Sequence, residues 1–332
     1  MRIALRAGSL ALLAACTGSA CAEALPTVAI VLNAPPASSL ASSPPTAPAA
    51  RAFFDAMKDR GWIDGRTARF IWRTAEQDPA RIPAIVDELV GLKVDVIVAS
   101  GNLIARVAKE KTRTIPIVLG ASEFAMESGL VQSYARPGGN VTGVSMMLDH
   151  LDAKRLGILK ELAPRVKRIA VLGQLNATNG EDVKGRTGKA VQALGLSAFH
   201  VRADRGEDIA AAFADAIRRG ADGMIVSSTG PMHRPENQAA LARLAIEHRI
   251  PVIYAVLRSV ESGGLAAYSA DELAAWHRAT GYVDRILRGA RPADLPIEHP
   301  SAYLLHVNRK AARAIGIEIP ASILAQADRV FE

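Results

Sequence analysis

Two apolar runs joined by a helical segment, all within residues 94–144, constrain the fold of this chain most strongly. The first run, residues 94–99, ends in a turn of small residues, and the second, residues 117–121, ends in a serine. Continuous β-branched runs without polar alternation are typical of parallel strands buried on both faces, and crossover helices join such strands. Ligands of open parallel sheets bind beyond the carboxyl ends of the strands, so these turns supply the first candidate ligand-binding residues. They are Ser100, Gly101, Asn102 and Ser122.

The same alternation of strand and helix extends along the chain on both sides of this unit. Buried strands are predicted at 27–33, 66–74, 168–173, 197–202, 223–227 and 251–255, and helices at 49–60, 78–92, 151–162, 182–194, 208–219 and 236–248. Two successive sets of about four strand-helix pairs indicate an α/β protein with two similar Rossmann-like lobes rather than one large sheet. The elements that remain after residue 256 are enough to cross back between the lobes and complete both sheets.

A chain of 332 residues is long enough for two lobes that each bury a core. We expect lobe 1 to comprise residues 25–145 and about 256–290, and lobe 2 to comprise residues 146–255 and about 291–332. Several crossings between the lobes would form a hinge, which is the outline of a binding protein that closes on its ligand. The long loop at 34–48 is rich in Pro and Ser, which indicates either a functional or a poorly ordered segment.

Residues 1–24 have the pattern of a secretory signal peptide, with a basic start, a short apolar core and small residues after it. The apolar run is far shorter than the roughly 20 residues that a membrane-spanning helix needs. Two modes of cleavage remain open. Leu13-Ala14-Ala15-Cys16 resembles a bacterial lipobox, which would make Cys16 a lipid anchor, whereas Ala20-Cys21-Ala22 resembles an ordinary cleavage site, which would remove both cysteines. We therefore expect an exported, periplasmic protein, either free or tethered to the membrane.

Several kinds of chemistry have little support in the sequence. From Leu25 onward there is no cysteine, which excludes an internal disulfide, a thiol nucleophile and a thiolate metal site from that part. The 7 histidines are scattered without a helical H-x-x-x-H pair, and no Gly-x-Ser-x-Gly elbow is present, so we expect no metal, no cofactor and no enzyme activity. A net charge of +7 without a Lys/Arg block favours a solvated surface over a nucleic-acid partner.

Equivalent positions in the second lobe supply further candidate ligand-binding residues, all at the ends of predicted strands. They are Gln174, Asn176, Ser227, Ser228 and Tyr254. Each of these residues also has a purely structural interpretation, because polar residues in turns also cap helices and close loops. Near the predicted hinge, Tyr268 would either stack on a ligand or fill the hinge, and Arg258 would either pair with an anionic group or remain solvated.

Eight segments, in order and spread over the chain after its first residues, carry a resemblance to a known family. They are residues 61–65 (GWIDG), 94–101 (VDVIVASG), 114–118 (TIPIV), 135–144 (ARPGGNVTGV), 250–254 (IPVIY), 261–268 (ESGGLAAY), 308–312 (NRKAA) and 319–324 (IPASIL). In these segments the chain resembles the bacterial ABC transporter substrate-binding proteins of the tryptophan/tyrosine type. The resemblance implies the type I periplasmic binding fold, in which two lobes are joined by a multi-crossing hinge.

The resemblance also implies a function. It indicates a monomeric receptor that binds a small molecule between its lobes and carries it to an ABC permease in the inner membrane, without catalysis. Many relatives carry Asp-Pro where Phe124-Ala125 stands here, so an aromatic ring replaces a carboxylate suited to a ligand amine, and Phe124 joins the candidates. An amino acid or another small carboxylate is the expected ligand, because Ser100 to Asn102 stand at a helix start. A sensory receptor that signals to a membrane kinase or chemoreceptor, and an exported α/β enzyme, remain alternatives.

Overall fold

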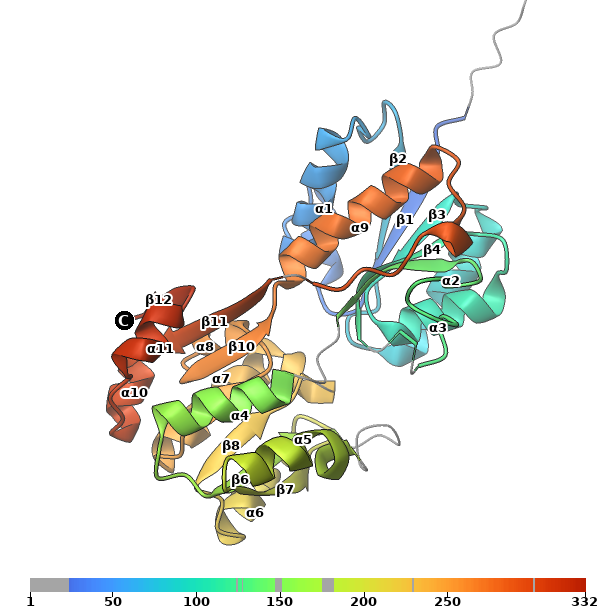
Figure 1. Ribbon diagram of the computed structural model, residues 1–332. Coiled ribbons are helices and arrows are strands. Elements are labelled where there is room, and N and C mark those ends of the chain that lie inside the picture. The colour runs from blue at the N-terminus through green and yellow to red at the C-terminus, as the bar shows by residue number, and fades with distance from the viewer. Residues whose placement is uncertain are drawn as a thin grey trace, which may run out of the picture.

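The structure is a computed structural model, and it describes residues 24–123, 125–126, 128–146, 151–174, 182–228, 230–300 and 302–332. The described chain forms two α/β lobes, each built around its own β-sheet (Figure 1). The expected fold class, two Rossmann-like lobes with several crossings between them, is confirmed. The signal peptide predicted at residues 1–24, with Cys16, lies almost wholly outside the described residues.

The first sheet has five parallel strands in the order β2-β1-β3-β4-β5. They are β1 (Thr27–Leu32), β2 (Arg69–Thr74), β3 (Val96–Ala99), β4 (Ile117–Glu123) and β5 (Val141–Met146). The strands follow the apolar runs of the sequence, and every residue of β3 and β5 is buried. Helix α1 (Pro48–Asp59) covers one face of this sheet, and α2 (Ile82–Gly91) and α3 (Asn102–Lys111) cover the other.

The second sheet has seven strands in the order β12-β11-β10-β9-β8-β6-β7. Strands β11 and β12 are parallel to each other and run antiparallel to the other five. They are β6 (Arg168–Gly173), β7 (Ser197–Arg202), β8 (Gly223–Val226), β9 (Val252–Tyr254), β10 (Ala266–Ala270), β11 (Tyr303–Asn308) and β12 (Arg329–Phe331). On one face pack α4 (Leu151–Leu162), α5 (Asp182–Ala193), α10 (Arg309–Ile315) and α11 (Ala321–Gln326). On the other face pack α6 (Asp208–Arg218), α7 (Pro235–Glu247) and α8 (Arg258–Glu261).

The expected lobe boundaries after residue 255 need correction. Strand β10 pairs with β9 and β11, so residues 266–270, expected in lobe 1, belong to the second sheet. Helix α9 (Glu272–Leu287) then returns to the first sheet, because its buried Trp276 and Tyr282 are part of the same core as α1. Residues 292–298, expected in lobe 2, follow it there through η4 (Pro292–Asp294), and the Ser145 amide donates to the Glu298 carbonyl at 2.9 Å.

The carboxyl ends of both sheets face the crossings between the lobes. Strand β5 is parallel to β4, and the chain passes from its end at Met146 into α4 of the second lobe. Strand β10 is parallel to β9, and the chain passes from its end at Ala270 into α9 of the first lobe (Figure 1). The turns after the parallel strands of both lobes therefore border one region, which we call the inter-lobe face.

Candidate functional site

Several of the predicted ligand-binding residues lie on the inter-lobe face. Ser100 follows β3 in the first lobe, Gln174 follows β6 in the second, and Ser227 and Ser228 follow β8. All four are half-buried, so each retains some exposed surface. The structure therefore brings together polar groups from both lobes at the ends of strands that are far apart in the sequence.

The start of α3 is the most distinct feature of this face. The Ser100 amide donates to the Val31 carbonyl at 3.0 Å, which fixes the end of β3 beside β1. Gly101 is the N-cap residue with φ 88°, a left-handed backbone that suits glycine, and it supplies no side-chain hydrogen bond to the helix. The first amides of a helix have no partners inside it, and the helix dipole makes this end positive. A carboxylate or another anion is the group that such a terminus binds.

Two exposed apolar side chains that the sequence argument missed follow the ends of β3 and β4. Leu103, the second residue of α3, is 36% exposed, and Met126, in the turn after β4, is 41% exposed. Because β3 and β4 are neighbours in the sheet, both residues follow adjacent strand ends. For Met126 the detectable signal was a large apolar residue in a turn, where polar residues are usual. Both side chains are therefore exposed apolar groups near the carboxyl end of the first sheet.

Two other predicted site residues are buried within their lobes. Ser122 is 0% exposed and lies inside β4, opposite Ser145 of β5, and its hydroxyl has no hydrogen-bond partner among the described residues. Tyr254 is 1% exposed in the second-lobe core, its hydroxyl also has no described partner, and burial raises its pKa above the usual tyrosine range. Neither side chain reaches the inter-lobe face in this structure.

The other four predicted site residues lie in different parts of the chain. Tyr268, in β10, packs against core residues of both lobes and stacks on Tyr303 with ring centroids 6.1 Å apart. Its phenol pKa is raised, first by desolvation and then by the neighbouring Tyr303. Arg258 begins α8 and is half-buried. Phe124 and Asn176 lie outside the described residues.

Arg155 is another residue that the sequence argument missed. It lies in the second turn of α4, just after a crossing between the lobes, and only 2% of it is exposed. Its Nε donates to the Tyr268 carbonyl at 2.8 Å and its Nη1 to Asp152 Oδ1 at 2.7 Å. Its Nη2 is buried and has no described partner. Arg155 therefore ties α4 to the hinge strand β10 through a charged hydrogen bond.

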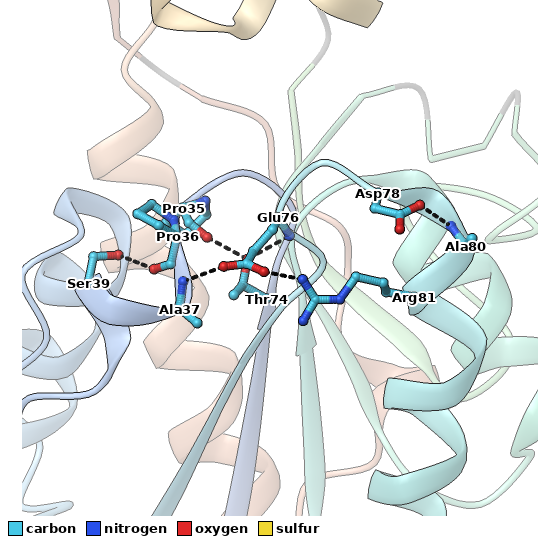
Figure 2. Close-up of polar contacts among 9 residues, drawn as sticks. All are labelled: Pro35, Pro36, Ala37, Ser39, Thr74, Glu76, Asp78, Ala80 and Arg81. Atoms are coloured by element: carbon cyan, nitrogen blue, oxygen red, sulfur yellow. Dashed lines mark hydrogen bonds and ion pairs between the residues drawn. The ribbon is translucent and has the colours of Figure 1, made fainter.

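The loop after β1, predicted to be either functional or poorly ordered, is held against the loop after β2. The Glu76 carboxylate accepts hydrogen bonds from the Ala37 amide at 2.8 Å and from Arg81, and Thr74 Oγ1 donates to the Pro35 carbonyl at 2.6 Å (Figure 2). The Ala37 amide, followed by Arg81, holds the Glu76 pKa below its usual range. These bonds fix the first part of the loop, including the short helix η1 (Ala37–Leu40), at the rim of the inter-lobe face.

A hollow of about 680 Å³ lies along the outer edge of β2, between η1 and α2. Its lining comes from the first lobe alone, so it is not an inter-lobe site. The protein's own side chains occupy part of this strand edge, because Asp64 accepts from the Phe70 amide and Arg73 donates to the Trp72 carbonyl, both at 2.9 Å. Capped edges of this kind resist the addition of another strand.

Nothing in the described part of the chain resembles a metal site, since no three His, Cys, Asp or Glu side chains are grouped to hold an ion. The described helices also include none with the length and apolar character needed to cross a bilayer. The site therefore consists of polar turns, a helix start and apolar side chains at the ends of two sheets. Such a site is suited to holding a small solute.

The family model for ABC transporter substrate-binding proteins matches residues 39–331. The chain belongs to this family of solute-binding proteins. A tyrosine-binding protein of Clostridioides difficile (strain R20291) is 27% identical over 289 residues, covering 85% of this chain and 80% of that protein.

Solved structures show the same fold. A conserved domain protein from Vibrio cholerae has a TM-score of 0.81 at 24% identity, covering 92% of this chain and 99% of that one. An ABC domain from Streptococcus pneumoniae in complex with L-Trp has a TM-score of 0.79 at 21% identity, covering 92% of this chain and 100% of that one. The family and the fold agree with the resemblance carried by the eight sequence segments, and they make this substrate-binding protein a receptor of the ABC importer type.

Proposed function

We propose that this substrate-binding protein takes up an amino acid with a large apolar side chain between its lobes and delivers it to an ABC permease, without chemical change. The start of α3 carries this proposal, because the positive N-terminal end of a helix suits the ligand carboxylate. Exposed Leu103 and Met126, after the neighbouring strands β3 and β4, suit an apolar side chain. The names of two relatives, a tyrosine-binding protein and a complex with L-Trp, support the same class of ligand.

Closure of the lobes would link binding to delivery. The first lobe offers Ser100, Gly101 and Asn102 to the carboxylate, and the second lobe offers Gln174, Ser227 and Ser228 to the rest of the ligand. A ligand that contacts both lobes gains its full set of contacts only when they close, so it shifts the population toward the closed form. A permease that recognises the closed form would then be engaged mainly by loaded receptor.

The N-terminal region completes the proposal. Residues 1–24 direct export, and the mature monomer works in the periplasm, either free or tethered through Cys16. The two cleavage modes differ in mass, because only lipobox processing leaves an acylated Cys16 as the first residue. Mass spectrometry of the exported protein distinguishes them.

The ligand class is tested by calorimetry and thermal unfolding with matched pairs of ligands. Each aromatic or large aliphatic L-amino acid is compared with its own carboxamide, which has the same side chain and amine but no negative charge. We expect the acid to raise the unfolding midpoint and the carboxamide to bind at least about tenfold more weakly, because a charged hydrogen bond is lost. Equal binding of acid and carboxamide would disprove the anion role of the α3 start.

A charge variant tests the place of binding. Asn102→Asp puts a negative charge at the α3 start, where acidic residues favour the helix, so the variant should fold normally. The same charge repels a bound carboxylate, and we expect at least about tenfold weaker binding. Gln192→Glu, an equal change of charge at an exposed site of α5, is the matched control and should leave affinity unchanged. If both variants bind equally well, the carboxylate lies elsewhere.

A further inference from the structure

The end of lobe 1 opposite the inter-lobe face is formed by the turns that precede its parallel strands. We call it the amino edge, and it comprises residues 24–26, 58–69, 91–95, 112–116, 134–140 and 288–295. Hydrogen bonds join these turns, since the Arg69 amide donates to Pro26 O at 2.9 Å and Asn140 Nδ2 donates to Thr112 O at 3.0 Å. The amino edge is therefore one continuous end of the lobe.

The amino edge is strongly basic. It carries nine exposed Lys and Arg side chains against four Asp; the nine are Lys58, Arg60, Arg66, Arg69, Lys93, Arg113, Arg136, Arg288 and Arg291. The equivalent turns of the second lobe, residues 163–167, 194–196, 218–222, 247–251 and 261–265, carry five basic residues against three acidic ones. The amino edge thus has a net charge of +5, against +2 for the shorter set of turns in the second lobe.

Helix ends account for part of this charge, because Arg60, Lys93 and Arg288 lie at or directly after helix C-caps. Cations are favoured near helix C-termini, and Lys58 in the last turn of α1 is explained in that way. Arg113 also directly follows the C-cap of α3, whereas Arg66 and Arg136 lie in turns that lead into strands, away from any helix end. No ion pair between described residues involves any of these three arginines. Their charges are available to a partner.

Three exposed apolar side chains stand among these charges. Leu25, Ile63 and Leu92 are 41%, 37% and 52% exposed. They precede β1, β2 and β3, which are neighbours in the sheet, so the three side chains lie at adjacent strand starts. Apolar groups surrounded by Lys and Arg are typical of surfaces that bind anionic membranes, where the charges meet headgroups and the apolar groups enter the interface.

Two observations indicate which partner binds this surface: its positive charge, and the place where the N-terminal segment joins the fold. A second copy of the chain would bring two basic edges together, and like charges repel. The segment before residue 24 joins the fold at this same edge. We propose that the amino edge of lobe 1 binds the surface of a membrane that contains anionic phospholipid. In that position the inter-lobe face points away from the bilayer, toward the solute.

The proposal is tested by co-sedimentation with lipid vesicles. The protein is expressed with Cys16→Ala in every arm, so that no acyl chain contributes to binding. Vesicles of phosphatidylethanolamine with about a third phosphatidylglycerol are compared with vesicles of phosphatidylcholine alone. We expect binding to the anionic vesicles only, and loss of that binding at about 0.5 M NaCl, because salt screens exposed charges.

Matched triple variants locate the surface. Lys58→Gln, Arg66→Gln and Arg113→Gln together should lower the vesicle partition coefficient at least about tenfold. Arg165→Gln, Lys167→Gln and Arg249→Gln remove the same charge from the second lobe and should lower it less than about threefold. Leu92→Gln, which changes no charge, should lower it a few-fold.

Three results would overturn the proposal. The first is no binding to the anionic vesicles at low salt. The second is an equal loss in both triple variants, which would show attraction by net charge alone. The third is binding to DNA or heparin as strong as to the vesicles, which would identify a general polyanion surface instead of a membrane surface. None of these results depends on ligand binding between the lobes, so the amino edge is tested separately from the solute site.

Discussion

The indole of Trp276 fills the space above Gly120, so that a Cβ on Gly120 would stand only 2.5 Å from the Trp276 ring. Gly120 lies within β4, and Trp276 is a buried residue of α9. Trp276 also meets Phe53 of α1 edge to face, with ring centroids 6.3 Å apart. The last α-helix of the first lobe is thus fixed in a core that comes mainly from the first half of the chain.

Gly120→Ala should destabilise the first lobe. The new methyl group would displace a fully buried indole, and overpacking of this kind costs about 1–3 kcal/mol. Urea unfolding followed by tryptophan fluorescence measures the loss. Gly139→Ala is the control, because a Cβ at that exposed glycine meets nothing within 4 Å. If the two variants unfold at the same urea concentration, α9 is free to move away from β4.

Glu76→Gln should loosen the loop after β1. The substitution removes the charge that Arg81 pairs with, and we expect hydrogen exchange of the Ala37 amide to become several-fold faster. The pH dependence follows from the lowered Glu76 pKa. The stabilisation that the charged Glu76 gives to the folded protein is present above the usual glutamate pKa of about 4.3. It is lost as the pH falls through the lower Glu76 pKa of the folded protein. Glu318→Gln, at an exposed site without a described ion pair, should leave the exchange unchanged.

Tyr254→Phe should leave solute affinity unchanged and stability equal or up to about 1 kcal/mol higher, since it removes a buried hydroxyl without a described partner. Burial raises the Tyr254 pKa, so the folded protein loses stability above about pH 10, where a tyrosine of the unfolded chain ionises. The phenylalanine variant should lose less stability between about pH 10 and 11 than the parent. A large loss of solute affinity would show instead that the hydroxyl reaches the ligand on closure.

Arg155→Gln should weaken the link between α4 and β10. Loss of a charged hydrogen bond to a backbone carbonyl costs about 1.5–3 kcal/mol, and the Tyr268 carbonyl would lose its guanidinium donor. Chemical denaturation measures this cost. Lys154→Gln, at the exposed neighbouring position on the same helix, should change stability by less than about 0.5 kcal/mol. Similar midpoints for the two variants would contradict a structural role for Arg155.

Most strands of both sheets could be predicted, because continuous apolar runs of this length, bounded by small residues, are typical of buried parallel strands. Helix α9 lies in lobe 1, within the range of about 256–290 expected there, although its apolar pattern alone does not fix its place. Its apolar face is compatible with either sheet, and only the fit of Trp276 over Gly120 places it on the first. The boundary expected near residue 256 failed for the same reason, since β10 is a short apolar strand whose hydrogen-bonding partners lie in the second sheet.

The predicted site residues that lie on the inter-lobe face are at positions where a turn directly follows a strand. Ser122 proved to be buried because β4 runs to Glu123, two residues beyond the predicted strand end, which places the serine inside the sheet. Tyr254 is buried because its ring packs in the core against Gly264, where a Cβ would lie 2.6 Å from the ring. Leu103, Met126 and Arg155 were missed since exposure and burial depend on tertiary packing, which single-sequence patterns do not contain.

The chain order of the first lobe has a consequence for export. The five strands of its sheet end at Met146, yet α9, which closes its core, is not complete until Leu287. During transfer across a membrane from the N-terminus onward, Trp276 can therefore cover Gly120 only after more than half of the chain beyond Met146 has crossed. Contacts so distant in sequence form slowly. The late arrival of α9 delays tight folding until nearly all of the polypeptide has crossed, and a chain that folds late stays competent for translocation.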